Sequence, residues 1–140
     1  MAELHKHLMV DMTLLKPPTS AEQVNDWLLR VVEKVNMNVF IPPMSKYCYT
    51  PGNEGVTGVV VIDTSHCSIH VWDHCEVAYA KADLYSCKDF SAQDFIEMIK
   101  EFEPLSYSYM VVDRTSDMRV IEVGSSPISF EAELAARKTA

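Results

Sequence analysis

Several kinds of segment are missing from this 140-residue chain. No apolar run approaches the roughly 20 residues of a membrane-spanning helix, so we expect no membrane contact. The opening residues are too polar and too short for the apolar region of a signal peptide. There is no internal repeat and no low-complexity segment. With 48% hydrophobic and 23% charged residues, the composition predicts one globular domain over 1–140.

Basic residues are also scarce. The chain has 12 Lys and Arg against 20 Asp and Glu, for a net charge of -8. This balance argues against a surface that follows nucleic-acid phosphates, so we expect no nucleic-acid partner. It weakly favours a cationic ligand, although acidity for solubility alone explains it as well.

The chain also lacks two cysteines at the sequence spacing that is typical of a metal-binding or redox-active pair. The four cysteines are Cys48, Cys67, Cys75 and Cys87, and no two of them are spaced as CxxC. This pattern predicts free thiols in a reducing cytoplasm. Free cysteines pack as small apolar residues unless one is placed for chemistry.

Hydrophobic periodicity gives the expected elements. A capping box at Ser20 and Gln23 opens an amphipathic helix over 21–36, and Ser91 caps a second helix. The tail 130–140 has helix-forming composition. Alternating or β-branched apolar runs predict strands at 7–15, 38–43, the first part of 44–55, 55–63, 66–72, 76–87, 106–114 and 118–123.

Two helices can cover only one face of such a sheet. The other face would carry a set of side chains that is too aromatic to leave in water: His70, Trp72, Tyr79, Tyr85 and Cys87. We therefore expect an α+β fold, a two-layer α/β sandwich with a mainly antiparallel sheet and both helices on one face. The open face would meet another protomer, giving an αββα homodimer or a higher homo-oligomer.

The central segment joins two strands without Gly or Pro, at Asp63-Thr64-Ser65. Three histidines follow at a spacing of four residues: His66, His70 and His74. On a helix they could share a metal ion, but on a strand such neighbours lie about 13 Å apart, so we expect no metal. Ser65 and His66 point to opposite faces of a strand, and no G-x-S-x-G segment is present, which argues against a serine hydrolase.

The same segment carries a family resemblance. "GVTGVVVIDTSHCSIHVW", followed by "AKADLYSC", resembles the self-processing segment of bacterial and archaeal S-adenosylmethionine decarboxylases. That family reads roughly G-V-S-G-V-V-V-I-x-E-S-H-x-x-I-H-x-W, then A-x-x-D-x-Y/F-T-C. The opening "HKHLMVDM" is similar to the family's first strand, and the resemblance spans about residues 5–115. The chain looks like a divergent branch.

The resemblance implies that the chain makes its own cofactor. The Ser65 hydroxyl would attack the carbonyl of Thr64, and cleavage would leave residues 1–64 and 65–140, with a pyruvoyl group derived from Ser65 and no pyridoxal phosphate. A strained, Gly-free junction suits such a cleavage. The family's serine and histidine that assist cleavage match Thr57 and His70.

The resemblance also implies the reaction. The pyruvoyl group would hold S-adenosylmethionine as a Schiff base and accept the electrons left by loss of CO2. Cys87 matches the cysteine that returns a proton to the α-carbon, and an ordinary thiol can donate near neutral pH. The product would be the aminopropyl donor for spermidine synthesis.

Substrate contacts are implied at Tyr49 and Trp72, whose rings could flank an adenine or a sulfonium; packing in the core is the alternative for both. The chain departs from the family in three places. Thr64 replaces the usual Glu, the loop after Trp72 is slightly longer, and His74 occupies the position of the ribose-binding carboxylate. Asp73 or Glu76 could take over that role.

The sequence leaves three alternative functions open. A basic amino acid, L-ornithine or L-arginine, could be decarboxylated on the same scaffold in an acidic pocket of Asp73, Glu76 and Asp83. The Thr64 departure could mark a binding or regulatory homologue that does not process itself. A purely structural dimeric domain would not need Ser65 at all.

Overall fold

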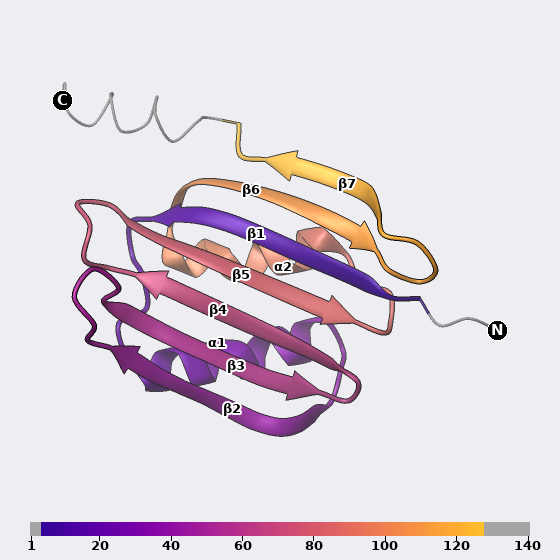
Figure 1. Ribbon diagram of the computed structural model, residues 1–140, viewed down its shortest axis with the longest axis horizontal. Helices are drawn as coiled ribbons and strands as arrows, with labels where there is room; N and C mark the ends of the chain where they lie inside the picture. Colours follow the sequence, from indigo (N-terminus) through magenta and orange to yellow (C-terminus); the bar gives the residue numbers. More distant parts are fainter. Residues whose placement is uncertain (1–3, 128–140) are drawn as a thin grey trace.

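Seven strands form one antiparallel sheet in the computed structural model, which describes residues 4–127 (Figure 1). The strands are β1 (Lys6–Leu14), β2 (Val39–Cys48), β3 (Gly55–Ile62), β4 (Ser65–Trp72), β5 (Ala78–Ser86), β6 (Pro104–Asp113) and β7 (Arg119–Ser125). Their order across the sheet is β2-β3-β4-β5-β1-β6-β7. Helices α1 (Ala21–Lys34) and α2 (Ala92–Ile99) lie on the same face, and a short 3-10 helix (Lys100–Phe102) follows α2. The predicted α+β sandwich is confirmed.

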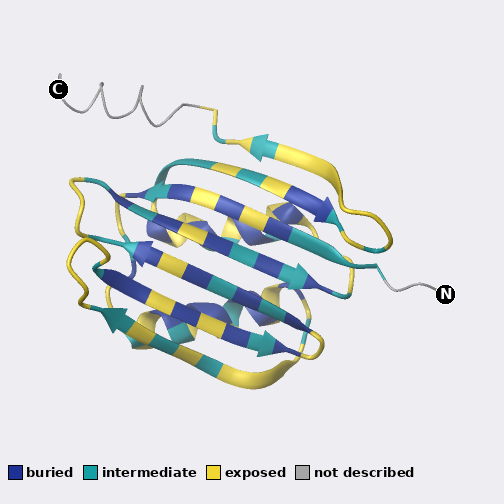
Figure 2. Cartoon of the chain, in the orientation of Figure 1, coloured by how far each residue is buried: buried dark blue, intermediate teal, exposed yellow. Residues whose placement is uncertain are grey.

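The core lies between the sheet and the two helices. Alternate residues of the central strands are buried beneath the helices, which gives the banded pattern of Figure 2. From α1, Trp27 packs edge-to-face on Phe95 of α2, and its ring N–H donates to the Met98 carbonyl at 2.8 Å. The predicted capping box is present, with Ser20 and Gln23 satisfying each other's backbone donors at the start of α1.

One predicted boundary was wrong. The sequence suggested one strand that ends with Pro42 and Pro43 and a second that starts at Met44, but β2 runs through both prolines as a single strand. Its pairing with β3 shifts between Val39 and Ile41 and again between Ile41 and Met44. Proline is tolerated there because β2 is an edge strand, where a missing N–H costs no ladder hydrogen bond. The tail 130–140 lies outside the described residues.

The face opposite the helices carries the polar and aromatic side chains that alternation predicted. His70 and Trp72 of β4 lie there with Tyr79 and Tyr85 of β5, Trp72 beside Tyr79 at one end and Tyr85 beside His66 toward the other. Cys87 differs, because β5 ends at Ser86 and the next residue turns toward the β3–β4 connection. The structure therefore has one helix-covered face and one open face, and the candidate site lies along the open face and one end of the sheet.

Candidate functional site

The connection between β3 and β4 is a tight turn of two residues, Asp63 and Thr64. Thr64 has φ +61°, the left-handed region that β-branched residues rarely adopt. Its hydroxyl donates to the Asp63 carbonyl at 2.8 Å. A non-glycine residue in this region typically stores about 1–3 kcal/mol of strain. The strain expected at this Gly-free junction therefore lies in the residue just before Ser65.

Ser65 begins β4 and is only 5% exposed. Its Oγ accepts a hydrogen bond from the backbone N–H of Cys87 at 3.0 Å. The Cys87 Sγ lies 2.7 Å from Thr64 Oγ1 and 3.8 Å from the Asp63 carbonyl oxygen. The Thr64 hydroxyl and the Cys87 thiol both lie within hydrogen-bonding distance of the Asp63 carbonyl oxygen, and either can be the donor in the contact between them. The Ser65 hydroxyl and the Cys87 thiol thus lie together at the turn.

A second set of residues lies at the other end of the same two strands. Thr57 and His70 face each other across β3 and β4, with Oγ1 and Nδ1 3.1 Å apart. Tyr49 and Thr57 line a hollow of about 580 Å³. Trp72 stacks on Tyr79, with ring centroids 4.9 Å apart and planes 10° from parallel. Aromatic walls beside an imidazole suit the binding of a planar or cationic group.

Of the two carboxylates predicted to replace the family's ribose ligand, Asp73 is the more firmly held. Its Oδ1 accepts a hydrogen bond from the Tyr47 hydroxyl at 2.8 Å. This hydrogen bond, with smaller effects of burial and charge, raises the pKa of Tyr47 to about 12. Glu76 is exposed, and its side chain makes no hydrogen bond within residues 4–127. Asp73 is therefore fixed beside Trp72.

Within one chain, the two sets do not meet. We call Thr64, Ser65 and Cys87 the turn group, and Tyr49, Thr57, His70, Trp72 and Asp73 the far group. The pairs Ile62–Ser65 and Thr57–His70 are five residues apart along the β3–β4 ladder. At about 3.3 Å per residue, the two groups lie roughly 17 Å from each other. The structure thus brings together Ser65 and Cys87, but not His70.

Comparison with known proteins identifies the family to which these groups belong. A family model described as S-adenosylmethionine decarboxylase matches residues 6–115, which include both groups. The chain belongs to the S-adenosylmethionine decarboxylase family. Among curated relatives, the S-adenosylmethionine decarboxylase proenzyme of Archaeoglobus fulgidus is 40% identical over 62 residues, covering 43% of this chain and 54% of that protein. The proenzyme of Thermomicrobium roseum is 27% identical over 116 residues, covering 81% and 96%.

The matched part of the chain spans only about half the length of the Archaeoglobus relative. Among solved structures, the adenosylmethionine decarboxylase from Aquifex aeolicus superposes with a TM-score of 0.68 at 22% identity, covering 84% of this chain and 95% of that one. This similarity establishes the fold that the decarboxylase family shares. Among residues 4–127, no helix is long and apolar enough to cross a membrane.

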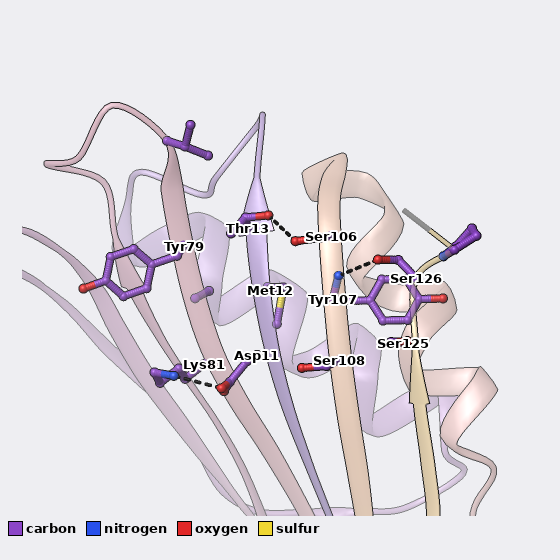
Figure 3. Close-up of a pocket in the computed structure, with 13 residues that line it drawn as sticks. Asp11, Met12, Thr13, Tyr79, Lys81, Ser106, Tyr107, Ser108, Ser125 and Ser126 are labelled. Carbon is purple, nitrogen blue, oxygen red and sulfur yellow. Dashed lines mark hydrogen bonds and ion pairs between the residues drawn. The ribbon is translucent and has the colours of Figure 1, made fainter. Parts of the chain in front are cut away.

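A hollow of about 640 Å³ on this decarboxylase-family sheet was not predicted from the sequence (Figure 3). Tyr79 and Lys81 of β5 line one side of it, and Ser108 of β6 lines the other. Lys81 forms an ion pair with Asp11 of β1 at 2.9 Å. Because Tyr79 also stacks on Trp72, this hollow adjoins the far group. The alternation of the sequence predicts that each of these side chains lies on the open face. It does not predict the strand order that makes them neighbours.

The second feature missed by sequence reasoning surrounds Asp83. Its carboxylate contacts His7 of β1 and both His66 and Ser68 of β4. The acidic pocket proposed for a basic amino acid required Asp83 to lie with Asp73 and Glu76. Asp83 instead pairs with Ser68 near the turn end of the sheet, whereas Asp73 follows the opposite end of β4. The three carboxylates do not gather within one chain.

Proposed function

We propose that this chain is a self-processing, pyruvoyl-dependent S-adenosylmethionine decarboxylase whose product is the aminopropyl donor for spermidine synthesis. The observation that carries the proposal is the strained Thr64–Ser65 junction, where the buried Ser65 Oγ accepts the Cys87 N–H and the Cys87 thiol lies against the turn. This arrangement falls inside the segment that matches the family. The free state of all four cysteines is consistent with a reducing cytoplasm.

The cleavage uses only groups of the chain and water. Ser65 Oγ bonds to the Thr64 carbonyl carbon as the C–N bond breaks, which converts the amide into an ester and leaves an amine on Ser65. Removal of the Ser65 α-proton then expels the Thr64 carboxylate. Water replaces the remaining nitrogen, which leaves as ammonia. The strain at Thr64 raises the energy of the starting amide, and the Cys87 N–H favours a more negative Ser65 oxygen.

The surroundings of Ser65 fit the pyruvoyl group that this cleavage would produce. The position is almost fully buried, and the Cys87 N–H points at the Ser65 side-chain oxygen, which would leave as part of the Thr64 carboxylate. When present, the pyruvoyl group supplies an electron sink for decarboxylation. The chain's own contribution is the Cys87 thiol, which lies at the turn within reach of the Asp63 carbonyl oxygen and can deliver a proton to the substrate carbon.

The separation of the turn group from the far group supports an active site shared between two chains. If two open faces pack with their strands running in opposite directions, the far group of one chain faces the turn group of the other. His70 and Thr57 of the partner would then assist cleavage at Ser65. The aromatic open face and its hollows would be closed in the same αββα dimer.

The far group also supports S-adenosylmethionine as the substrate. Tyr49 is 81% exposed and Trp72 half-buried, so both rings are accessible to a purine or a sulfonium. Asp73, held by Tyr47, can accept hydrogen bonds from the ribose hydroxyls. A net charge of -8 favours the approach of a cationic substrate. Decarboxylation of ornithine or arginine is less well supported, because its three expected carboxylates are dispersed.

Intact mass spectrometry tests the proposal. The purified chain should give fragments 1–64 and 65–140, the second with a carbonyl terminus, and release labelled CO2 from S-adenosylmethionine but not from ornithine or arginine. Ser65→Ala should remain whole at 15.8 kDa and inactive. Cys87→Ala should cleave but turn over slowly, which separates processing from catalysis. Release of CO2 by a chain whose 64–65 bond is intact would disprove the mechanism.

A further inference from the structure

Three side chains with metal-binding atoms converge on the open face from three neighbouring strands. They are His7 of β1, His66 of β4 and Asp83 of β5, and each is half-buried. Asp83 Oδ2 lies 2.7 Å from His7 Nε2 and 3.3 Å from His66 Nε2. All three candidate ligand atoms lie within 4.8 Å of one another.

We propose that His7, His66 and Asp83 form a binding site for one divalent transition-metal ion, with Zn²⁺ as the reference ion. Two imidazole nitrogens and one carboxylate oxygen are a common set for zinc and its neighbours, whereas Mg²⁺ and Ca²⁺ prefer oxygen ligands. Ligands around a tetrahedral zinc lie roughly 3.4 Å apart, so small side-chain rotations bring these atoms into range. Water would complete the coordination.

The position of Asp83 favours metal binding. The Ser68 hydroxyl donates to Oδ1, which orients the carboxylate and leaves Oδ2 directed at the two imidazoles. Burial alone would raise the pKa of Asp83, but hydrogen bonds from His7 and Ser68 and the charge of His66 lower it to about 2. Asp83 is therefore an anionic ligand at neutral pH, and Ser68 supports it from behind.

Arg114 competes with the metal in the metal-free chain. Its Nη1 lies 3.1 Å from His7 Nδ1, and its guanidinium stacks 4.7 Å above the Tyr85 ring. A guanidinium can only donate, so His7 Nδ1 accepts and Nε2 carries the proton. A metal on Nε2 would move that proton to Nδ1 and displace Arg114 from it. Because Arg114 is exposed, it can withdraw, but its charge opposes a nearby dication.

The site is independent of the proposed self-cleavage. It uses no residue of the turn group or the far group. All three ligands are already in place before any cleavage of the chain. It also differs from the His66, His70 and His74 series, whose members cannot share an ion on a strand. Metal binding would link β1, β4 and β5, and so stabilise the centre of the sheet by mass action.

Calorimetric titration with ZnCl2 tests the site, using full-length Ser65→Ala chain without a tag and stripped of metal, so that cleavage plays no part. We expect one Zn²⁺ per chain and a rise in melting temperature. His66→Gln and Asp83→Asn should each weaken binding at least roughly tenfold. His74→Gln is the matched control: His74 lies in an exposed loop beside Cys75, 3.4 Å away, and its loss should leave the affinity unchanged.

Arg114→Gln gives a test that leaves all three ligands in place. Removing the positive charge that lies beside His7 should tighten zinc binding several-fold. Unchanged affinity in Arg114→Gln, absence of saturable binding, or binding lost in His74→Gln but kept in His66→Gln would each overturn the proposal. The last result would assign the zinc to His74 and Cys75 instead.

Discussion

At the scale of single residues, the backbone of Thr64 is the most informative feature. A β-branched residue at φ +61° is strained, and the strain lies next to the bond that we propose is broken. Thr64→Gly should relieve it. In the Ser65→Ala background, where the chain stays whole, we expect Thr64→Gly to raise the free energy of unfolding by about 1 kcal/mol in urea.

In the chain that retains Ser65, the same substitution should slow self-cleavage about fivefold, because about 1 kcal/mol less strain is stored in the starting amide. Denaturing gels over time give the rate. Asn36, with φ +59° at the end of α1, is the matched control, since Asn36→Gly changes a similar backbone far from the turn. Equal cleavage rates for Thr64→Gly and the unmodified chain would show that strain does not drive the reaction.

The residues of the turn group could be selected from the sequence, but their contacts could not. Ser65 and Cys87 follow from the family resemblance, and the missing glycine indicated strain near them. The contact between the Cys87 thiol and Thr64 depends on where β5 ends, and alternation placed Cys87 on the open face instead. A strand's last residue is set by competing local hydrogen bonds, here those between Ser86 and Lys88. Hydrophobic periodicity carries no information about these bonds.

At the scale of elements, patterns within one segment were predicted well and pairings between segments were not. The capping box of α1 and the alternation of β4 are local, so the sequence contains all that determines them. The two prolines of β2 led to a wrong strand boundary, because a strand tolerates proline only where it lies at the edge of the sheet, and the sequence of one segment does not show this. The His7, His66 and Asp83 cluster requires β5 to lie between β1 and β4, which no single segment specifies.

Asp83 is expected to make this three-strand junction sensitive to acid. Its pKa is lowered from 3.8 to about 2, so its ionised form stabilises the folded chain above pH 4, and this contribution disappears as the pH falls toward 2. In EDTA, Asp83→Asn in the uncleaved Ser65→Ala chain should therefore lose about 2 kcal/mol of unfolding free energy at pH 7. Urea titrations at several pH values measure the difference.

The difference between the two chains should close between about pH 4 and pH 2, because protonated Asp83 resembles Asn. Asp11→Asn is a suitable control, since the Asp11–Lys81 pair lies on the same face but both side chains are more than half exposed. Exposed pairs contribute little, so this variant should change stability only slightly. If the difference in unfolding free energy caused by Asp83→Asn stays constant down to pH 2, the lowered pKa of Asp83 is contradicted.

At the scale of the whole molecule, the distance between the turn group and the far group decides how the site is assembled. A rigid antiparallel ladder of six residue pairs holds Ser65 and His70 five residues apart, and neither residue lies on a loop that could bring them together. Covering the open face with a second chain accounts for its aromatic side chains as well as for this separation. The shared-site dimer therefore makes a prediction that a site within one chain does not.

Complementation between two inactive chains distinguishes these arrangements. Ser65→Ala lacks the nucleophile, and His70→Ala lacks the imidazole expected to assist cleavage. In a mixed dimer, one site carries both lesions, and the other combines Ser65 of the His70→Ala chain with His70 of the Ser65→Ala chain. Co-expression should therefore restore cleavage of the His70→Ala chain, to about half of those molecules if pairing is random. If differently tagged chains co-purify as mixed dimers and the His70→Ala chain still stays whole, His70 does not act across the interface.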